Sequence, residues 1–128
     1  MAVLPLTYYP VPLLRQMAAR VDDVTAAAIQ QLLLDLRETM LAAPGIGLAA
    51  PQVGLLQRVI VVRVEDGVLP LVNPEIIDVS RRVESGEEGC LSIPGVFGLV
   101  RRPWRIQVTA KAPTGEPLKF TAQALVAR

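Results

Sequence analysis

The chain has 128 residues, the length of one ordinary domain built around one hydrophobic core. Its 13 basic and 12 acidic residues leave a formal net charge of +1, which gives no electrostatic basis for binding nucleic acid or an anionic membrane. No apolar run approaches the roughly 18 residues of a membrane helix, and no basic stretch precedes the first apolar residues, so neither a membrane span nor a signal peptide is predicted. A single cysteine excludes a disulfide within the chain and is typical of the cytoplasm, and histidine is absent.

The first third of the chain predicts one long helix after an extended start. Pro10 and Pro12 keep the start extended or turned, and Pro12 favours a short helical turn. Thr25 is the expected cap of the long helix, and Pro44 followed by Gly45 is its expected end. The apolar stripe that predicts this helix consists of Ile29, Leu32, Leu33, Leu36 and Met40.

The rest of the chain predicts short strands and the start of a second helix. Residues 45–54 are expected to form a loop or an irregular strand, and a helix is expected to begin near Gln123. Apolar runs, alternation and turn residues predict these strands: Arg58–Val64, Leu69–Val72, Glu75–Val79 after a break at Asn73 and Pro74, Arg82–Glu84 before a loop at Gly86, Arg105–Ala112, and Leu118–Thr121. The predicted class is α+β, with residues 1–128 forming a single domain.

The segment Gly45-Ile46-Gly47-Leu48-Ala49-Ala50-Pro51-Gln52-Val53-Gly54 is the first motif with chemical content. Gly45, Gly47 and Ala50 match the glycine pattern of a dinucleotide-binding loop, which needs a strand before it and a helix after it. Here a helix precedes the glycines, and Pro51 disfavours helix at Ala50. Two interpretations remain. The segment is either a connection without function or a cleft loop in which the Gln52 amide donates a hydrogen bond to a developing oxyanion.

The second motif is Glu87-Glu88-Gly89-Cys90-Leu91-Ser92-Ile93-Pro94. Taken alone, Cys90 is typical of a small buried apolar residue, and a cysteine nucleophile is excluded because no histidine can act as its base. Glu87 and Glu88 alone are typical of a solvated turn, and Ser92 alone of a residue that hydrogen-bonds within a loop.

Together, the two motifs resemble the first two of the three signatures of the peptide deformylase family. The opening segment, from Tyr9 to Arg15, resembles that family's Pro-x-Pro-x-Leu-Arg start, and the expected elements follow in the family's order, so the resemblance runs from Tyr9 to Arg128. It implies a peptide-deformylase-like α+β fold. This fold has one long N-terminal helix, short and mostly antiparallel strands, and a C-terminal metal-binding helix that is cut short.

The resemblance also implies an activity, which is removal of the N-formyl group from the starting methionine of nascent proteins by a metal-dependent hydrolase. The native metal is Fe²⁺, which Ni²⁺, Co²⁺ or Zn²⁺ can replace. By matching motif positions, Cys90 would be the thiolate ligand, and Gln52 and the Leu91 N–H would stabilise the oxyanion. The cleft that pairs with an extended formylmethionyl peptide would be lined by Ile46, Gly47 and Gly89.

Two further residues match positions behind the metal ligand. Glu88 resembles a carboxylate that supports the site from outside the ligand set. Arg102 is either its charge partner or a solvated surface arginine.

The third family signature, H-E-x-x-H on a helix, is absent from these 128 residues and is expected a few residues beyond Arg128. We therefore expect this chain alone to bind no catalytic metal and to be inactive. Three interpretations stay open: part of an active deformylase, a non-catalytic peptide-binding relative, or a subunit completed by a second chain. We also expect self-association through sheet residues left uncovered near Val59–Val62, Ile106 and Val108.

Overall fold

The computed structural model describes residues 3–8, 11–43, 45–124 and 126. Within these ranges one α-helix and mostly antiparallel strands confirm the predicted α+β class. No helix of the described residues has the length and apolar character needed to cross a membrane. In chain order the elements are η1 (Pro12–Arg15), α1 (Ala27–Ala42), β1 (Gly47–Ala49), η2 (Ala50–Val53), β2 (Val59–Val64), β3 (Gly67–Val79), β4 (Val83–Cys90), β5 (Ile93–Pro103), β6 (Arg105–Lys111) and β7 (Pro117–Gln123).

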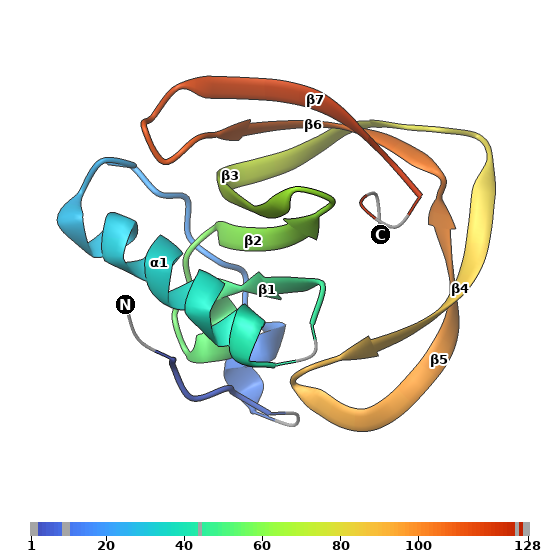
Figure 1. The fold of residues 1–128 in the computed structure, drawn as a ribbon, viewed down its shortest axis with the longest axis horizontal. Coiled ribbons are helices and arrows are strands. Elements are labelled where there is room, and N and C mark those ends of the chain that lie inside the picture. Colours follow the sequence, from blue (N-terminus) through green and yellow to red (C-terminus); the bar gives the residue numbers. More distant parts are fainter. Residues whose placement is uncertain (1–2, 9–10, 44, 125, 127–128) are drawn as a thin grey trace.

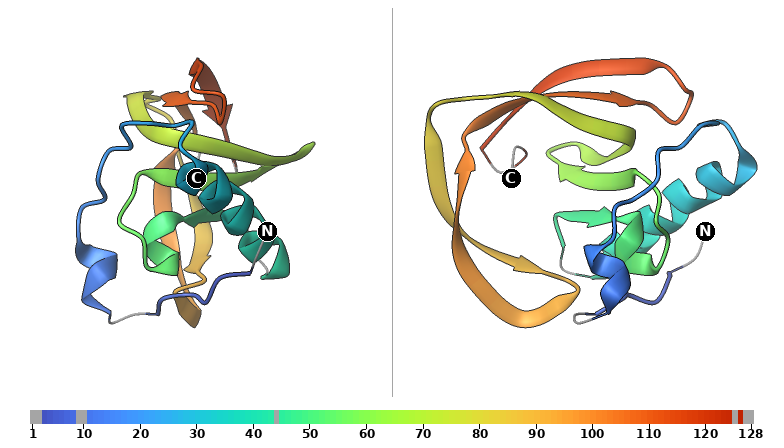
Figure 2. Two further views of the ribbon diagram at one scale, coloured as in Figure 1. Left: turned by 90° about the vertical axis from the view of Figure 1, so that its left-hand side faces the viewer. Right: turned by 180° about the vertical axis from the view of Figure 1, so that it is seen from behind.

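The strands form two sheets that are joined through β3. A five-stranded antiparallel sheet has the order β1-β2-β3-β6-β7, and β4 pairs with β5 as a separate antiparallel ribbon. Figure 1, and the rear view in Figure 2, show this ribbon leaving the end of β3 and curving round until its tip lies close to the loop that precedes β1. The curved ribbon therefore brings the second sequence motif back to the first.

Helix α1 packs against β1 and β2 and forms the main core. The five residues of the predicted stripe are all buried, and Leu36 and Met40 have no exposed surface. They pack with residues of the adjoining strands, of which Val59 and Val61 are also fully buried. The predicted cap at Thr25 is wrong, because helix α1 begins at Ala27 without a side-chain cap, and Thr25 instead binds the Asp23 carboxylate through its N–H and its hydroxyl.

Strand β3 runs unbroken through the position where the sequence predicted a break. Asn73 adopts a positive φ of 52°, a conformation that Asn tolerates better than most residues, and the register with β6 shifts between Val72 and Glu75. Neither Asn73 nor Pro74 is in register with a residue of β2 or β6, so the missing N–H of Pro74 costs no ladder bond. The first half of β3 pairs with β2 and the second half with β6, and the strand thereby links the two halves of the sheet.

The Asn73 side chain predicts a measurable loss of stability on substitution. Its Oδ1 accepts a hydrogen bond from the Val21 N–H (2.8 Å), and its Nδ2 donates to the Val21 carbonyl (2.9 Å). Val21 is only 7% exposed. We expect Asn73→Ala to lower the free energy of unfolding in urea by roughly 1–3 kcal/mol, because two polar groups of Val21 lose their partners. Asn73→Asp keeps the acceptor for the Val21 N–H but turns a carboxylate oxygen toward the Val21 carbonyl, so it is expected to lose stability as well. Equal stability of Asn73→Ala and the parent would contradict this role.

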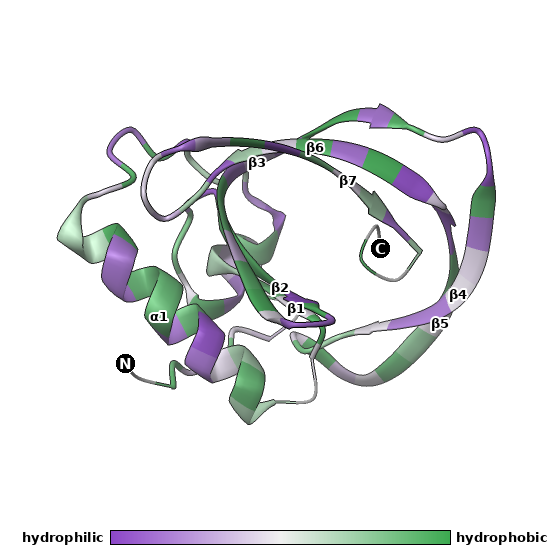
Figure 3. Cartoon of the chain, turned by 45° about the horizontal axis from the view of Figure 1, so that its top comes forward, coloured by the Kyte–Doolittle hydropathy of each residue, from purple (hydrophilic) through white to green (hydrophobic). Residues whose placement is uncertain are grey.

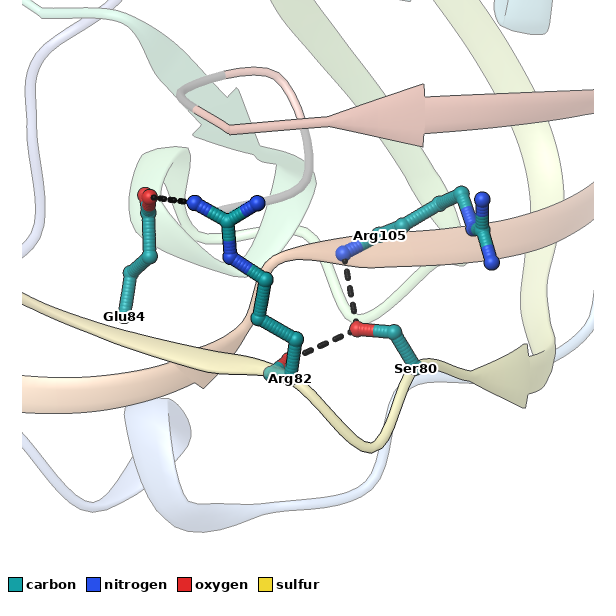
Figure 4. A network of polar contacts seen from close by, with 4 residues as sticks. All are labelled: Ser80, Arg82, Glu84 and Arg105. Carbon is teal, nitrogen blue, oxygen red and sulfur yellow. Dashed lines mark hydrogen bonds and ion pairs between the residues drawn. The ribbon is translucent and has the colours of Figure 1, made fainter.

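The base of the β4–β5 ribbon is fixed by a small polar network, which is drawn in Figure 4. The Ser80 hydroxyl donates to the Arg82 carbonyl (2.7 Å) and accepts from the Arg105 N–H (3.1 Å). Arg82 lies over the Trp104 ring, 4.5 Å from its centroid, and forms an exposed ion pair with Glu84. These contacts tie the start of β4 to the junction between β5 and β6, so the direction in which the ribbon leaves the sheet is set here.

Three expectations for the second half of the chain are corrected. The loop predicted at Gly86 is part of β4, and β3 and β5, with 13 and 11 residues, are longer than the short strands expected. The helix expected near Gln123 is not found in the described residues, because β7 continues to Gln123 and Ala124 has a φ of 54°. Leu125, Ala127 and Arg128, on which the rest of that prediction falls, lie outside the described residues.

The apolar residues that the sequence analysis expected to be uncovered are mostly buried, and other apolar residues are exposed. Val59 and Val61 are fully buried, and Ile106 and Val108 are only 8% and 7% exposed. Exposed apolar side chains instead occur on β3 and β5, where Figure 3 shows hydrophobic segments on the curved strands; they include Ile76, Ile77, Val79, Val96, Phe97 and Leu99. Self-association stays a prediction, and these residues now define the surface through which we expect it.

Candidate active site

A cavity of about 610 Å³ brings the two sequence motifs together. Its walls come from the loop before β1, the tip of the β4–β5 ribbon and the N-terminal segment Leu6–Tyr8. Seven of the eight predicted site residues line it, namely Ile46, Gly47, Gln52, Glu88, Gly89, Cys90 and Leu91. The eighth, Arg102, is not among the lining residues.

The Gln52 side chain is oriented by its own local structure. Gln52 lies in the third position of η2, and its Oε1 accepts a hydrogen bond from the Ala49 N–H (3.0 Å) just before this turn. Gly54, in a left-handed conformation with φ 89°, ends the turn. Because the carbonyl side of the amide is occupied by Ala49, the NH₂ group of Gln52 faces the cavity.

The Gln52 NH₂ group contacts the tip of the ribbon at two atoms. Its Nε2 lies 3.5 Å from Cys90 Sγ and 3.4 Å from Ser92 Oγ. Cys90 is exposed, whereas Ser92 is 2% exposed, and Leu91 and Ser92 make the turn between β4 and β5. The site therefore places an amide donor beside a thiol, and a buried hydroxyl holds the same amide. Cys90 is not the buried apolar residue that its type alone would predict.

Two glycines at the cavity have side chains of other residues packed close to their backbone. A Cβ built on Gly45 would lie 2.8 Å from Leu91 Cδ1, and a Cβ built on Gly89 would lie 2.6 Å from Phe97 Cε1. Both distances are too short for real carbon atoms, so a side chain at either glycine would displace Leu91 or the Phe97 ring. Glycine at these positions therefore lets the Leu91 side chain and the Phe97 ring lie close to the backbone beside the cavity.

The cavity also borders the edge of the larger sheet. Strand β1 lies at one edge of that sheet, and among the described strands it pairs only with β2. Gly47, the first residue of β1, lines the cavity, and the carbonyl of the preceding Ile46 accepts from the Arg63 N–H (2.7 Å). An edge strand beside a cavity can pair with the main chain of an extended peptide.

Glu88 and Arg102 form a two-point ion pair across the ribbon. Arg102 Nη2 lies 3.1 Å from Glu88 Oε1, and Arg102 Nε lies 3.3 Å from Glu88 Oε2. The two residues are not direct partners in the β4–β5 register, since Glu84 pairs with Arg102 and Gly98 with Glu88, so the ion pair links positions four residues apart along the ribbon. Of the two interpretations left open for Arg102, the structure supports that of charge partner to Glu88.

The residues present do not fit a catalytic metal. Such a site typically uses three protein ligands and leaves one position open. The sequence contains no histidine, and within the described part of the chain no three Cys, Asp or Glu side chains come together as a metal site would require. The neighbour of the Cys90 sulfur is an amide NH₂ group, which donates hydrogen bonds and is not a metal ligand. The described residues thus provide one sulfur ligand and no complete set.

Several residues that were not predicted from the sequence also belong to the site. Leu6, Tyr8 and Phe97 line the cavity. Ser92 does not line it, but its hydroxyl contacts the Gln52 amide. Ser92 had a usable signal, because it is a hydroxyl within the second motif. The other three are apolar or aromatic residues in segments without periodicity, and the sequence carried no sign that they meet.

Comparison with known proteins agrees with this arrangement. Residues 3–128 match the family model described as polypeptide deformylase. The chain belongs to the polypeptide deformylase family. The resemblance inferred from the two motifs is thereby confirmed.

Among the relatives of this deformylase chain, the peptide deformylase of Acetivibrio thermocellus is 48% identical over 119 residues, covering 90% of this chain and 66% of the relative. That of Symbiobacterium thermophilum is 46% identical over 131 residues and covers 100% and 59%. The chain thus spans two thirds or less of the length of these two relatives.

Solved structures confirm the fold. The crystal structure of peptide deformylase from Thermotoga maritima superposes with a TM-score of 0.96 at 34% identity, covering 100% of this chain and 86% of that one. Peptide deformylase from Synechococcus elongatus, in complex with actinonin, gives 0.93 at 42% identity and covers 98% and 68%. The predicted peptide-deformylase-like fold is therefore correct, apart from the strand lengths and the helix near Gln123 corrected above.

Proposed function

We propose that these 128 residues form the formyl-peptide-binding part of a peptide deformylase. The observation that carries the proposal is the 3.5 Å contact between Gln52 Nε2 and Cys90 Sγ, which joins the two motifs through residues 38 positions apart in the chain. Within one cavity it combines a side-chain donor, a thiol and an adjacent edge strand. A formylated peptide end needs this combination, because its carbonyl takes a hydrogen bond and its main chain pairs with a strand.

In this proposal the predicted residues have different roles. The Gln52 NH₂ group and the Leu91 N–H donate to the formyl oxygen and stabilise the negative charge that develops there during hydrolysis. Ile46, Gly47 and Gly89 contact the peptide main chain, while the Arg102 ion pair holds Glu88 at the cavity wall. Cys90 offers its sulfur as a metal ligand, although no imidazole within these 128 residues joins it.

Hydrolysis itself needs groups that these residues do not contain. In the family a metal such as Fe²⁺, Ni²⁺, Co²⁺ or Zn²⁺ supplies activated water, and it requires ligands and a base beyond one thiolate. We therefore propose that the chain by itself binds formylmethionyl nascent peptides without cleaving them. The cytoplasm is the compartment that suits this substrate and the exposed Cys90 thiol.

Titration calorimetry tests the proposed binding. A formyl-Met-Ala-Ser peptide is expected to bind more tightly than the same peptide without its formyl group. Gln52→Ala is expected to remove most of this difference, with a loss of roughly 1–3 kcal/mol in binding free energy, because one buried hydrogen bond to the formyl oxygen disappears. Gln57→Ala, outside the cavity lining, is the matched control. Equal affinity of the parent chain for both peptides would refute the proposal.

A further inference from the structure

We infer that Tyr8 and Phe97 make this cleft selective for peptides with apolar side chains in the residues that follow the formylmethionine. The inference rests on the proposed function and adds a substrate preference to it. Its basis is that these two residues come from separate segments of the chain and line the same cavity as Gln52 and Cys90.

The exposed apolar residues of the cavity are concentrated around the candidate site. Tyr8 is 48% exposed, Ile46 46%, Ile93 38% and Phe97 65%, and all four line this one cavity. Single exposed apolar side chains are normal on a protein surface, but several around one cleft indicate a surface that is covered by a ligand. A peptide lying in the cleft with apolar side chains would bury them.

The Phe97 ring lies against the ribbon although it is exposed. It pairs with Gly89 across the β4–β5 ribbon, and its ring lies so close to Gly89 that an added Cβ would meet Phe97 Cδ1 at 2.7 Å. The ring therefore rests on the backbone of the residue that precedes Cys90. A ring in this position presents a large apolar surface at the cleft, which favours contact with an apolar peptide side chain.

Tyr8 is carried by a segment that is tied to the site. The Thr7 N–H donates to the Gln52 carbonyl (2.6 Å), and the Leu4 N–H donates to Thr39 Oγ1 (2.9 Å), whose residue is 2% exposed. Leu6 and Tyr8, on either side of Thr7, both line the cavity. The backbone of the residue that donates to the formyl oxygen thus also positions the wall that contains Tyr8.

The polar and apolar parts of the cavity imply the direction of the peptide. Its formyl end lies at the Gln52 amide, and the residues after methionine extend over the rims that carry Tyr8 and Phe97. An apolar side chain there gains contact with an aromatic ring, whereas a serine side chain gains none. The cleft should therefore prefer formyl-Met-Leu-Phe over formyl-Met-Ser-Ser.

Calorimetry with these two peptides tests the inference on four variants of the chain. Tyr8→Ala and Phe97→Ala are each expected to raise the dissociation constant of formyl-Met-Leu-Phe roughly three- to tenfold, the effect of one lost aromatic contact, and to change that of formyl-Met-Ser-Ser by less than about twofold. Val3→Ala and Leu99→Ala are the controls, because these residues are 60% and 82% exposed, occupy the same two segments and do not line the cavity. The controls are expected to match the parent with both peptides.

The outcomes separate this inference from the proposed function. If the parent binds both peptides and the Tyr8 and Phe97 variants behave like the controls, the selectivity is refuted and the formyl-binding site stands. A variant that weakens both peptides equally also refutes it, because its effect is then structural. If the parent binds neither formylated peptide, the proposed function fails and the inference fails with it. Circular dichroism of each variant, compared with the parent, verifies that the fold is intact.

Discussion

The purified 128-residue chain is expected to hydrolyse a formylmethionyl peptide no faster than the same metal ion does in buffer. Enzymes accelerate their reactions by a factor of about a million or more, and in a metal hydrolase this acceleration depends on a complete ligand set around the metal. Here the described residues contain one cysteine sulfur at the cavity and no cluster that could complete it, and the whole sequence has no histidine. We therefore expect this chain to show none of the rate enhancement that a complete metal site would provide.

Metal analysis and a deformylation assay check this prediction together. After incubation with Fe²⁺, Ni²⁺ or Zn²⁺ and removal of the free ion, we expect well below one metal ion per chain. Peptide deformylase from Thermotoga maritima, purified in parallel, is the active control for the assay. A stoichiometric metal ion in this chain, or hydrolysis that Cys90→Ala abolishes, would overturn the conclusion that the residues present do not fit a catalytic metal.

Leu36→Ala is expected to cost about 3–5 kcal/mol of unfolding free energy, which is a large part of the stability of an ordinary domain. Leu36 has no exposed surface and lies in the core that α1 forms with β1 and β2, so truncation leaves a cavity that the helix and sheet cannot close. The site depends on this core because β1 and η2, which carry Gly47 and Gln52, are the next elements after α1.

Unfolding in guanidinium chloride, followed by Trp104 fluorescence, measures the effect. Leu34→Ala is the matched control, because Leu34 lies on the same helix and is 44% exposed, and it is expected to cost less than about 1 kcal/mol. Similar losses for the two variants would show that α1 does not pack as described.

The parts of the fold that follow a simple hydrophobic period were predictable from the sequence. The helical stripe ending at Met40 and the strand Val59–Val64 are confirmed, because burial against one partner imposes a period of 3.6 or a continuous apolar run. Strand β4 was not predictable in this way. It contains Gly86 and Gly89, which have low strand propensity, and its pairing with β5 overrides that preference.

The residues of the site were identified by their motifs, but their geometry was not accessible from the sequence. Nothing in the spacing of Gln52 and Cys90 predicts that the β4–β5 ribbon curves back to β1. The direction of the Gln52 amide depends on the Ala49 N–H, and the close contacts of Leu91 with Gly45 and of Phe97 with Gly89 require residues without a side chain. These are tertiary contacts between segments, which a local pattern does not encode.

An NMR experiment with a peptide labelled at its formyl group tests whether Gln52 and Leu91 bind the formyl oxygen. We expect intermolecular nuclear Overhauser contacts from the formyl proton to the Gln52 side-chain NH₂ and to the backbone N–H of Leu91, because the proposed function assigns both donors to the formyl oxygen. A bound peptide whose formyl proton shows contacts elsewhere on the chain, with none to Gln52 or Leu91, would contradict it.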